Sequence, residues 1–302
     1  MMAALSQPEL NERIEVAYQL LESCRVCPRE CGVNRLKNDK LGFCRSGLNP
    51  IISSVSPHYG EEPPLSGARG SGTVFFTNCN LRCVYCQNYP ISQMGNGEER
   101  TPGELACQML WLQEQACHNL NLVTPTHFVP QILKALGIAI QRGFNLAIVY
   151  NTSGYESMEI LRLLDGIVDI YLPDMRYSDN GAAVKYSGAP GYSEINRAAI
   201  KEMYRQVGNL VLDEQGVAKQ GLIVRHLVLP GNIAGTEAVM KFLAEEISKD
   251  VSISLMSQYF PAYRAREFKE INRRITAEEY EKAYQIMLKY GLENGWVQEH
   301  DL

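Results

Sequence analysis

Short β-branched runs alternate with longer segments of helical period along most of the chain. The runs cover residues 73–78, 120–124, 145–151, 168–173, 222–230 and 252–260, and a helical segment follows each of them. Six strand–helix units in succession predict a parallel sheet with helices packed outside it. The expected class is therefore α/β, and a single barrel fits the length of the chain.

Two helix starts support this assignment. Thr101 and Glu104 stand three residues apart at the start of one helical segment, with a proline between them, and Thr276 and Glu279 repeat the spacing. This is the pattern of a capping box. The side chain of the N-cap residue accepts from the backbone N–H of the third helical residue, N3, and the N3 carboxylate accepts from the backbone N–H of the N-cap residue. The helices following the first and the sixth strand should begin at these residues.

The amino-terminal part differs from the rest. Residues 8–23 have a helical pattern, whereas residues 24–73 contain Pro, Gly and Ser throughout and are expected to be irregular. The pattern predicts two parts, an extension with an initial helix over residues 1–69 and a partial (β/α)6 barrel over residues 70–302.

Charge and hydropathy exclude several classes of partner. The net charge is −5, and the basic residues are dispersed, so no surface suited to nucleic acid is expected. No run approaches the length that spans a bilayer, and the first residues lack the pattern of a secretory signal. The expected location is the cytoplasm, with no membrane partner.

Nine cysteines add candidate chemistry. Seven of them fall into two tight clusters, which in a reducing compartment is typical of metal or cofactor ligands. Cys107 and Cys117 lie in a helical pattern and are expected to be small core residues.

Polar residues follow all six predicted strands. The carboxyl ends of parallel strands meet at one edge, where such folds hold their chemistry. The segments that end or follow the strands are Cys79 after the first strand, residues 123–127, 150–154, 173–176, 225–231 and 256–261.

The second, denser cluster contains only three cysteines, Cys79, Cys83 and Cys86. A structural zinc site needs four ligands and a disulfide leaves one thiol over, whereas three thiolates suit a four-iron cluster with one iron open to an external ligand. The spacing C-x3-C-x2-C, with Tyr85 before the last cysteine, resembles the signature of the radical SAM superfamily. That resemblance implies a 4Fe–4S cluster, S-adenosylmethionine (SAM) bound at the open iron, and a 5′-deoxyadenosyl radical that abstracts hydrogen from the substrate.

Further runs resemble the pyruvate formate-lyase activating enzymes. They are CNLRCVYCQN, the glycine-rich GSGTVFF, the Asp174–Arg176 pair and the R-x-x-V-x-P-G run from Arg225. The resemblance implies a partial (β/α)6 barrel and an electron donor such as flavodoxin or ferredoxin. The substrate is then one of two kinds: a glycine of a large glycyl radical enzyme, or else a small molecule or peptide. The EEPP segment at residues 61–64 is a candidate lid, which would favour a small substrate.

Position by position, the resemblance implies a SAM site. Tyr85 would lie against the adenine. The ribose would contact Asn151 and Ser153, and the methionyl group would meet Asp174, Arg176 and Arg225.

One family feature is missing from this site. The family's Gly-Gly-Glu run after the second strand is absent, and Thr124, Thr126 and backbone carbonyls are the candidate substitutes for binding the amino group. His127 is expected to be a core or turn histidine rather than a catalytic one. His226 is also expected to have a structural role, because it points to the strand face opposite Arg225.

The other cluster has the spacing C-x2-C-x3-C-x12-C and consists of Cys24, Cys27, Cys31 and Cys44. Four thiolates in an extension with little core of its own favour a structural zinc ion. An auxiliary iron–sulfur cluster and unligated cysteines remain the alternatives.

Overall fold

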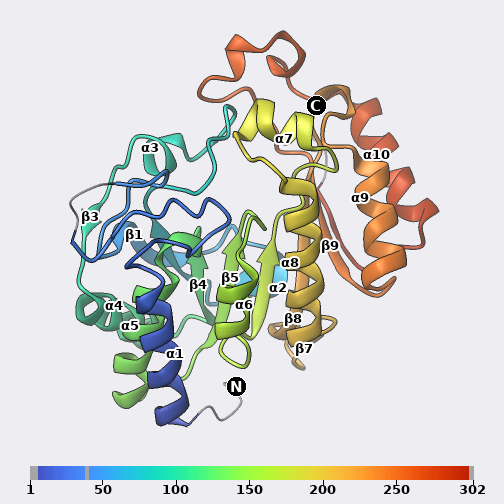
Figure 1. Cartoon of the computed structure of the whole chain (residues 1–302). Coiled ribbons are helices and arrows are strands. Elements are labelled where there is room, and N and C mark those ends of the chain that lie inside the picture. The colour runs from blue at the N-terminus through green and yellow to red at the C-terminus, as the bar shows by residue number, and fades with distance from the viewer. Residues whose placement is uncertain (1–5, 38–40, 299–302) are drawn as a thin grey trace.

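The computed structural model describes residues 6–37 and 41–298, and they build one mostly parallel sheet whose helices stand along its outer side (Figure 1). Within these residues the strand order is β10-β9-β8-β6-β5-β4-β2-β1-β3, and β7 pairs with β8 off this path. The two ends of the path do not pair with each other, so the barrel is partial.

The six predicted strands are all present. They are β2 (Ser71–Phe76), β4 (Asn119–Val123), β5 (Ala147–Thr152), β6 (Ile170–Pro173), β8 (Ala218–Leu227) and β9 (Ser252–Met256). Neighbouring strands among them pair in parallel. The predicted α/β class and the partial (β/α)6 barrel are therefore confirmed.

Helices cover the outer face of this sheet (Figure 1). They are α1 (Gln7–Gln19), α4 (Pro102–Glu114), α5 (Val129–Gln141), α6 (Met158–Leu163), α7 (Asn180–Ser187), α8 (Tyr192–Val207), α9 (Thr236–Phe242) and α10 (Ala277–Lys289). A π-helical turn, Leu243–Ile247, continues α9. Both predicted capping boxes are formed, at Thr101 and at Thr276, and a third at Ser6 begins α1.

The expectation that residues 24–73 are irregular is wrong for one strand. β1 (Ile51–His58) pairs antiparallel with β2 and extends the sheet beyond the barrel's first parallel strand. Its side chains are mostly half-buried and several are serines, so the apolar alternation that marks a strand is weak. β1 also joins the two predicted parts of the chain in one sheet, and the boundary at residue 69 stays a prediction.

Several short elements had no sequence pattern long enough to predict them. They are α2 (Pro63–Ser66), α3 (Tyr89–Ser92), β3 (Glu98–Glu99), β7 (Val211–Leu212) and β10 (Gly295–Val297). β10 adds a further parallel strand beside β9. The sheet therefore continues past the six predicted units.

The inner face of the barrel has its own small core. On β5, Val149 faces this core, whereas its neighbours Ile148 and Tyr150 pack against the outer helices. Leu65 of α2 is fully buried in the inner core, and its carbonyl accepts a hydrogen bond from Asn119 Nδ2 at 2.8 Å. Residues 61–66 therefore enter the barrel interior.

Two further expectations can be compared with the structure. Cys117 is buried, but Cys107 is exposed on α4, so the prediction of two core cysteines is wrong for Cys107. The helical pattern predicts that Cys107 lies on a helix, but it does not fix which side of α4 faces the core. Cys107 lies on the side that faces solvent. Among the described residues, no helix combines the length and the apolar composition needed to cross a membrane.

Candidate active site

The carboxyl ends of the parallel strands surround a cavity of about 640 Å³. Nine residues predicted from the sequence line it: Cys79, Cys83, Cys86, Thr124, Asn151, Ser153, Asp174, Arg176 and Arg225. They come from the loops and ends of five different strands, and the parallel arrangement brings them to one edge of the sheet. Thr124 also has a φ of 60°, which is a strained conformation for a β-branched residue and is often found at functional sites.

The loop after β2 presents three thiols to this cavity. Leu81 N–H donates to Cys79 Sγ at 3.3 Å, Ser187 Oγ–H donates to Cys83 Sγ at 3.0 Å, and Cys86 Sγ lies 3.1 Å from Ser92 Oγ. Hydrogen bonds to sulfur favour the thiolate form that ligates metal.

Burial has the opposite effect on these thiols. It raises the pKa of Cys79 to about 12, and it also raises the pKa of Cys86. A strong positive charge is therefore needed to hold these sulfurs as thiolates. A metal centre supplies such a charge, and this donor set fits an iron–sulfur cluster.

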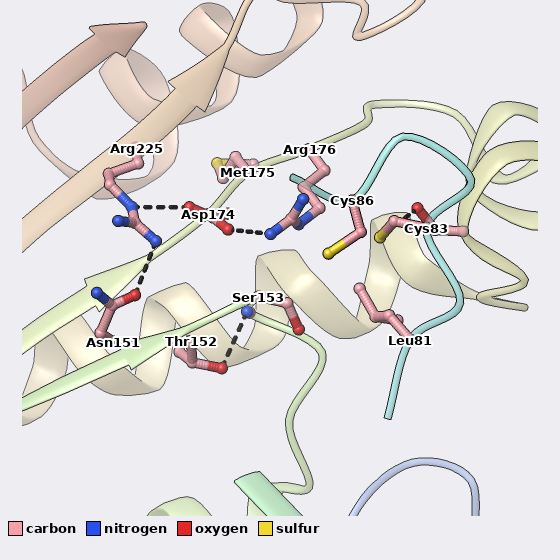
Figure 2. Close-up of polar contacts among 12 residues, drawn as sticks. Leu81, Cys83, Cys86, Asn151, Thr152, Ser153, Asp174, Met175, Arg176 and Arg225 are labelled. Carbon is pink, nitrogen blue, oxygen red and sulfur yellow. Dashed lines mark hydrogen bonds and ion pairs between the residues drawn. The ribbon is translucent and has the colours of Figure 1, made fainter. Parts of the chain in front are cut away.

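A buried ion network lies beside the thiols (Figure 2). Asp174 Oδ1 accepts from Arg225 Nε at 2.8 Å, and Asp174 Oδ2 accepts from Arg176 Nη2 at 2.5 Å. Arg225 Nη2 also donates to Asn151 Oδ1 at 2.7 Å. Two guanidinium groups share one carboxylate, so the network retains a positive charge that suits an anionic ligand group such as a carboxylate.

Two polar atoms in this region have no hydrogen-bond partner among the described residues. Ser153 Oγ and Arg176 Nε are both buried. Buried polar atoms are nearly always paired, so these two mark places where a bound polar molecule would be held. Both residues belong to the predicted SAM site.

Two predicted cofactor residues do not line the cavity. Tyr85 is 3% exposed; its hydroxyl lies 2.5 Å from the Tyr177 hydroxyl, and its ring packs edge-on against Tyr259. Thr126 Oγ donates to Glu156 Oε1 at 2.6 Å in a buried position. Their contacts with SAM stay predictions, and the placement of these two side chains does not favour them.

The two histidines have the structural roles that were expected. His226 lies fully buried between the Met175 carbonyl, at 2.7 Å, and Thr236 Oγ, at 3.0 Å. His127 Nε2 lies 2.9 Å from the Thr77 carbonyl. Burial lowers the pKa of His226 to about 4 and that of His127 to about 3, so both rings are neutral near pH 7.

Glu156 is a buried carboxyl directly behind the cavity. It accepts hydrogen bonds from the hydroxyls of Thr126, Thr152 and Tyr150. Burial outweighs these three donors and raises its pKa to about 7. The folded chain therefore retains this proton over a pH range in which the unfolded chain releases it.

Replacing Glu156 with Gln should remove a pH dependence of stability. Between pH 4.5 and 7 the Glu156 carboxyl binds more protons in the folded state than in the unfolded state. The free energy of unfolding of the unmodified protein therefore falls as pH rises through this range, by about 3 kcal/mol in total. The Glu156→Gln variant should lack this decrease. Thermal unfolding midpoints at pH 5 and pH 8 measure it, with the exposed Glu159→Gln as control. Equal pH responses in the Glu156→Gln variant and the unmodified protein would contradict the assignment.

The cysteine quartet of the extension is folded against the active-site loop. Cys24, Cys27 and Cys44 are buried, Cys31 is half-buried, and Phe43 N–H donates to Cys31 Sγ at 3.3 Å. Backbone hydrogen bonds close the loop that carries the first three cysteines of the quartet, from Gly32 N–H to the Cys24 carbonyl at 3.1 Å and from Glu30 N–H to the Cys27 carbonyl at 3.0 Å. The described residues hold no group arranged for a single metal ion. A metal at the quartet therefore stays a prediction.

Metal analysis of anaerobically reconstituted protein should separate the alternatives for the quartet. A zinc ion there predicts about one zinc and about four irons per chain, whereas a second cluster predicts close to eight irons without zinc. Replacing Cys27 with Ala should remove only the quartet's metal. About four irons and no zinc, unchanged by that substitution, would show that the quartet is unligated.

The segment after β9 holds the thiol loop from the other side. Gln87 Nε2 donates to the Gln258 carbonyl at 2.9 Å, and Arg264 N–H donates to the Val84 carbonyl at 2.8 Å. The rings of Tyr89 and Tyr263 stack with centroids 5.1 Å apart. We call residues 258–264 the latch, because they connect the sixth strand of the barrel to the loop of the first.

Part of the cavity wall consists of residues that the sequence did not predict as site residues. Glu61, Glu62 and Trp296 line the cavity together with the predicted residues. The sequence predicts the EEPP segment only as a candidate lid, and nothing in its pattern indicates that α2 enters the barrel. Trp296 stands on β10, a strand of three residues that is too short to recognise.

Comparisons with known proteins agree with this site. Residues 73–180 match the model of the radical SAM superfamily. An uncharacterized protein of Methanocaldococcus jannaschii, MJ0674, is 33% identical over 294 residues, covering 94% of this chain and 80% of the relative. A second from the same organism, MJ0808, is 26% identical over 80% of this chain and 71% of its own length.

Two solved structures are more distant. TYW1 with a lysine–pyruvate adduct bound has a TM-score of 0.44 at 10% identity, over 72% of this chain and 73% of that chain. HydG, a maturase of the FeFe-hydrogenase, has a TM-score of 0.47 at 12% identity, over 97% of this chain and 57% of that chain.

Proposed function

The chain belongs to the radical SAM superfamily, and from this premise we propose that it cleaves SAM reductively and abstracts hydrogen from a small-molecule substrate. The observation that carries the proposal is one cavity lined by Cys79, Cys83 and Cys86 and by the Asp174–Arg176–Arg225 network. The thiols suit a 4Fe–4S cluster, and the network suits the charged methionyl end of SAM.

The chain's residues would bind and orient the cofactors. Cys79, Cys83 and Cys86 would ligate the cluster, and the positive network would hold the methionyl carboxylate through Arg176 and Arg225. When bound, the cofactors would supply the chemistry, which is the one-electron reductive cleavage of SAM, with an electron from a donor such as flavodoxin or ferredoxin, and the abstraction of a hydrogen atom from the substrate.

Ser153 and Asn151 complete this orientation. Ser153 Oγ is a buried hydroxyl without a partner among the described residues, and it would donate to the ribose. Asn151 is fixed by Arg225, so its amide is presented in one orientation. Asp174 keeps both guanidinium groups in place.

Two observations favour a small substrate. The cavity volume of about 640 Å³ lies within the range of about 300–1,000 Å³ typical of small-molecule sites, and SAM would fill part of it, so the remaining space suits a small substrate. Residues 61–66 also occupy the barrel interior, where Leu65 packs in the inner core. A loop from a folded partner would have less room there than in an open barrel.

Activation of a glycyl radical enzyme is the alternative. Its support is the set of runs that resemble the pyruvate formate-lyase activating enzymes, together with the unclosed seam of the barrel. Such a seam would give a partner's loop access to the radical.

Electron paramagnetic resonance separates the two functions. Reconstituted protein is incubated with SAM, a reductant and the glycyl radical enzymes of the same cell, and 5′-deoxyadenosine is quantified in parallel. The proposal expects 5′-deoxyadenosine, stimulated by a metabolite, and no glycine-centred doublet. A doublet would establish the alternative, and no 5′-deoxyadenosine under any condition would contradict both.

A further inference from the structure

Two adjacent glutamates form one wall of the cavity, on the side of the barrel interior. Glu61 and Glu62 line the cavity, and α2 directly after them is anchored by Leu65 in the inner core. Ser66 Oγ donates to the Glu61 carbonyl at 3.2 Å, and Leu65 N–H donates to the Glu62 carbonyl at 2.8 Å. The backbone of this acidic wall is therefore fixed, and its carboxyl groups are not on a mobile loop.

The charge of the acidic wall is only partly compensated by the cations nearest to it. The ion pairs of Arg176 and Arg225 both go to Asp174. The hydrogen bond to Glu61 Oε1, from Asn151 Nδ2, is long at 3.5 Å. Burial raises the pKa of Glu61 to about 7, the charge of Arg225 opposes this rise, and Glu62 adds to it. Two neighbouring carboxyls thus lie in a site where a further positive charge would stabilise both.

A buried amide independently indicates a missing ligand. Asn121 is fully buried, and neither its Oδ1 nor its Nδ2 has a hydrogen-bond partner among the described residues. It shares a face of β4 with Val123, which lines the cavity, and it pairs with Val149 of the inner core. From beyond hydrogen-bonding geometry, this amide acts on Glu61 as a weak donor that lowers the pKa of the carboxyl, so Nδ2 faces Glu61 and Oδ1 is the atom left without a donor. Asn121 therefore points at the acidic wall.

The cavity as a whole favours a cation. Three carboxyls, Glu61, Glu62 and Asp174, line it together with two guanidinium groups, those of Arg176 and Arg225. Asp174 is occupied by the two arginines, so the unmatched negative charge is concentrated at the acidic wall. A carboxylate pair beside a neutral amide acceptor is suited to an ammonium or guanidinium group, which has only donors to offer.

We propose that Glu61, Glu62 and Asn121 bind an ammonium or guanidinium group of the small-molecule substrate, and thereby orient the substrate within the cavity. This inference rests on the proposed function. Charge-assisted hydrogen bonds from the cation would neutralise the two carboxylates and would give Asn121 Oδ1 the donor that it lacks among the described residues. The ammonium group of SAM is the competing ligand for the same carboxylates.

Matched pairs of carboxylates without an α-ammonium group test the charge preference. Calorimetric titrations use reconstituted protein saturated with SAM, with 5-aminopentanoate against pentanoate and 4-guanidinobutanoate against 4-ureidobutanoate as probes. Each pair keeps a similar length, and only one member carries a cation. We expect the cationic member to bind at least about tenfold more tightly, as one charge-assisted hydrogen bond implies. Equal affinities within both pairs, or no binding of any probe, would overturn the proposal.

A double variant assigns the preference to the acidic wall. The substitutions Glu61→Gln and Glu62→Gln together should abolish the preference and leave the affinity for SAM within about threefold. Glu267→Gln is the matched control, because it alters only an exposed ion pair with Arg264. This control variant should keep the charge preference. A charge preference unchanged in the double variant would overturn the proposal. An equal loss of SAM affinity would overturn it too, because the glutamates would then serve SAM.

Formation of 5′-deoxyadenosine is measured on the same samples to separate this inference from the proposed function. If the double variant lacks the charge preference but still cleaves SAM, the acidic wall acts on the substrate alone. If unmodified protein cleaves no SAM, the proposed function fails. If it cleaves SAM but shows no charge preference, only the present inference fails.

Discussion

Replacing Cys79, Cys83 or Cys86 with alanine should abolish formation of 5′-deoxyadenosine from SAM. The three thiols line the same cavity, and the fit to a four-iron cluster requires all of them, because each would ligate a different iron. Loss of one ligand leaves two, which is too few to keep the cluster in place with an open iron. We expect a loss of at least about a thousandfold, since the electron for cleavage would arrive through this centre.

The measurement is chromatographic quantification of 5′-deoxyadenosine under anaerobic reduction, with iron content determined for each variant. Cys107→Ala is the matched control, because this thiol is exposed on α4 and contacts Arg142. It should keep full activity. Undiminished product in all three cysteine variants would contradict the superfamily's chemistry for this chain.

Replacing Asp174 with Asn should destabilise the fold and weaken SAM binding together. Asp174 is 5% exposed and pairs with two partly buried arginines, so the amide would leave their charges without compensation. Removing one partner from a buried ion pair typically costs about 3–5 kcal/mol of the free energy of unfolding. Arg176 and Arg225 would also lose the carboxylate that orients them, and we expect SAM affinity to fall by about a hundredfold or more.

Denaturant unfolding and equilibrium binding of SAM measure the two effects. Glu267→Gln serves again as control, because it breaks an exposed ion pair with Arg264, for which a change of about 0–1 kcal/mol is expected. A stable Asp174→Asn variant with unchanged SAM affinity would show that the network is only structural.

The sheet could be predicted from the sequence because its central strands are buried on both faces. Such strands appear as continuous apolar runs, and the helices between them have their own period. β1 lacked this signal, since only the two-residue strand β3 lies beyond it and it carries Ser53, Ser54 and Ser56. β10 is too short for any period to be visible.

The active-site residues were predictable for a related reason. Asn151, Asp174 and Arg225 stand at the ends of successive parallel strands, and topology alone brings such positions together. Glu61 was not predictable, because its position depends on where α2 packs, which is a tertiary contact between distant parts of the chain. The orientation of the Tyr85 ring likewise depends on Tyr177 and Tyr259, far away in the sequence.

The latch has a consequence for biosynthesis. The thiol loop is held by Gln258, Tyr263 and Arg264, and the ribosome adds the last of these about 180 residues after Val84. At translation rates of about 5–20 residues per second, this interval is about 10–40 s. For most of it, the three cysteines have left the ribosome without their final support. We therefore expect iron to be inserted after most of the chain has been made, with the nascent thiols protected until then.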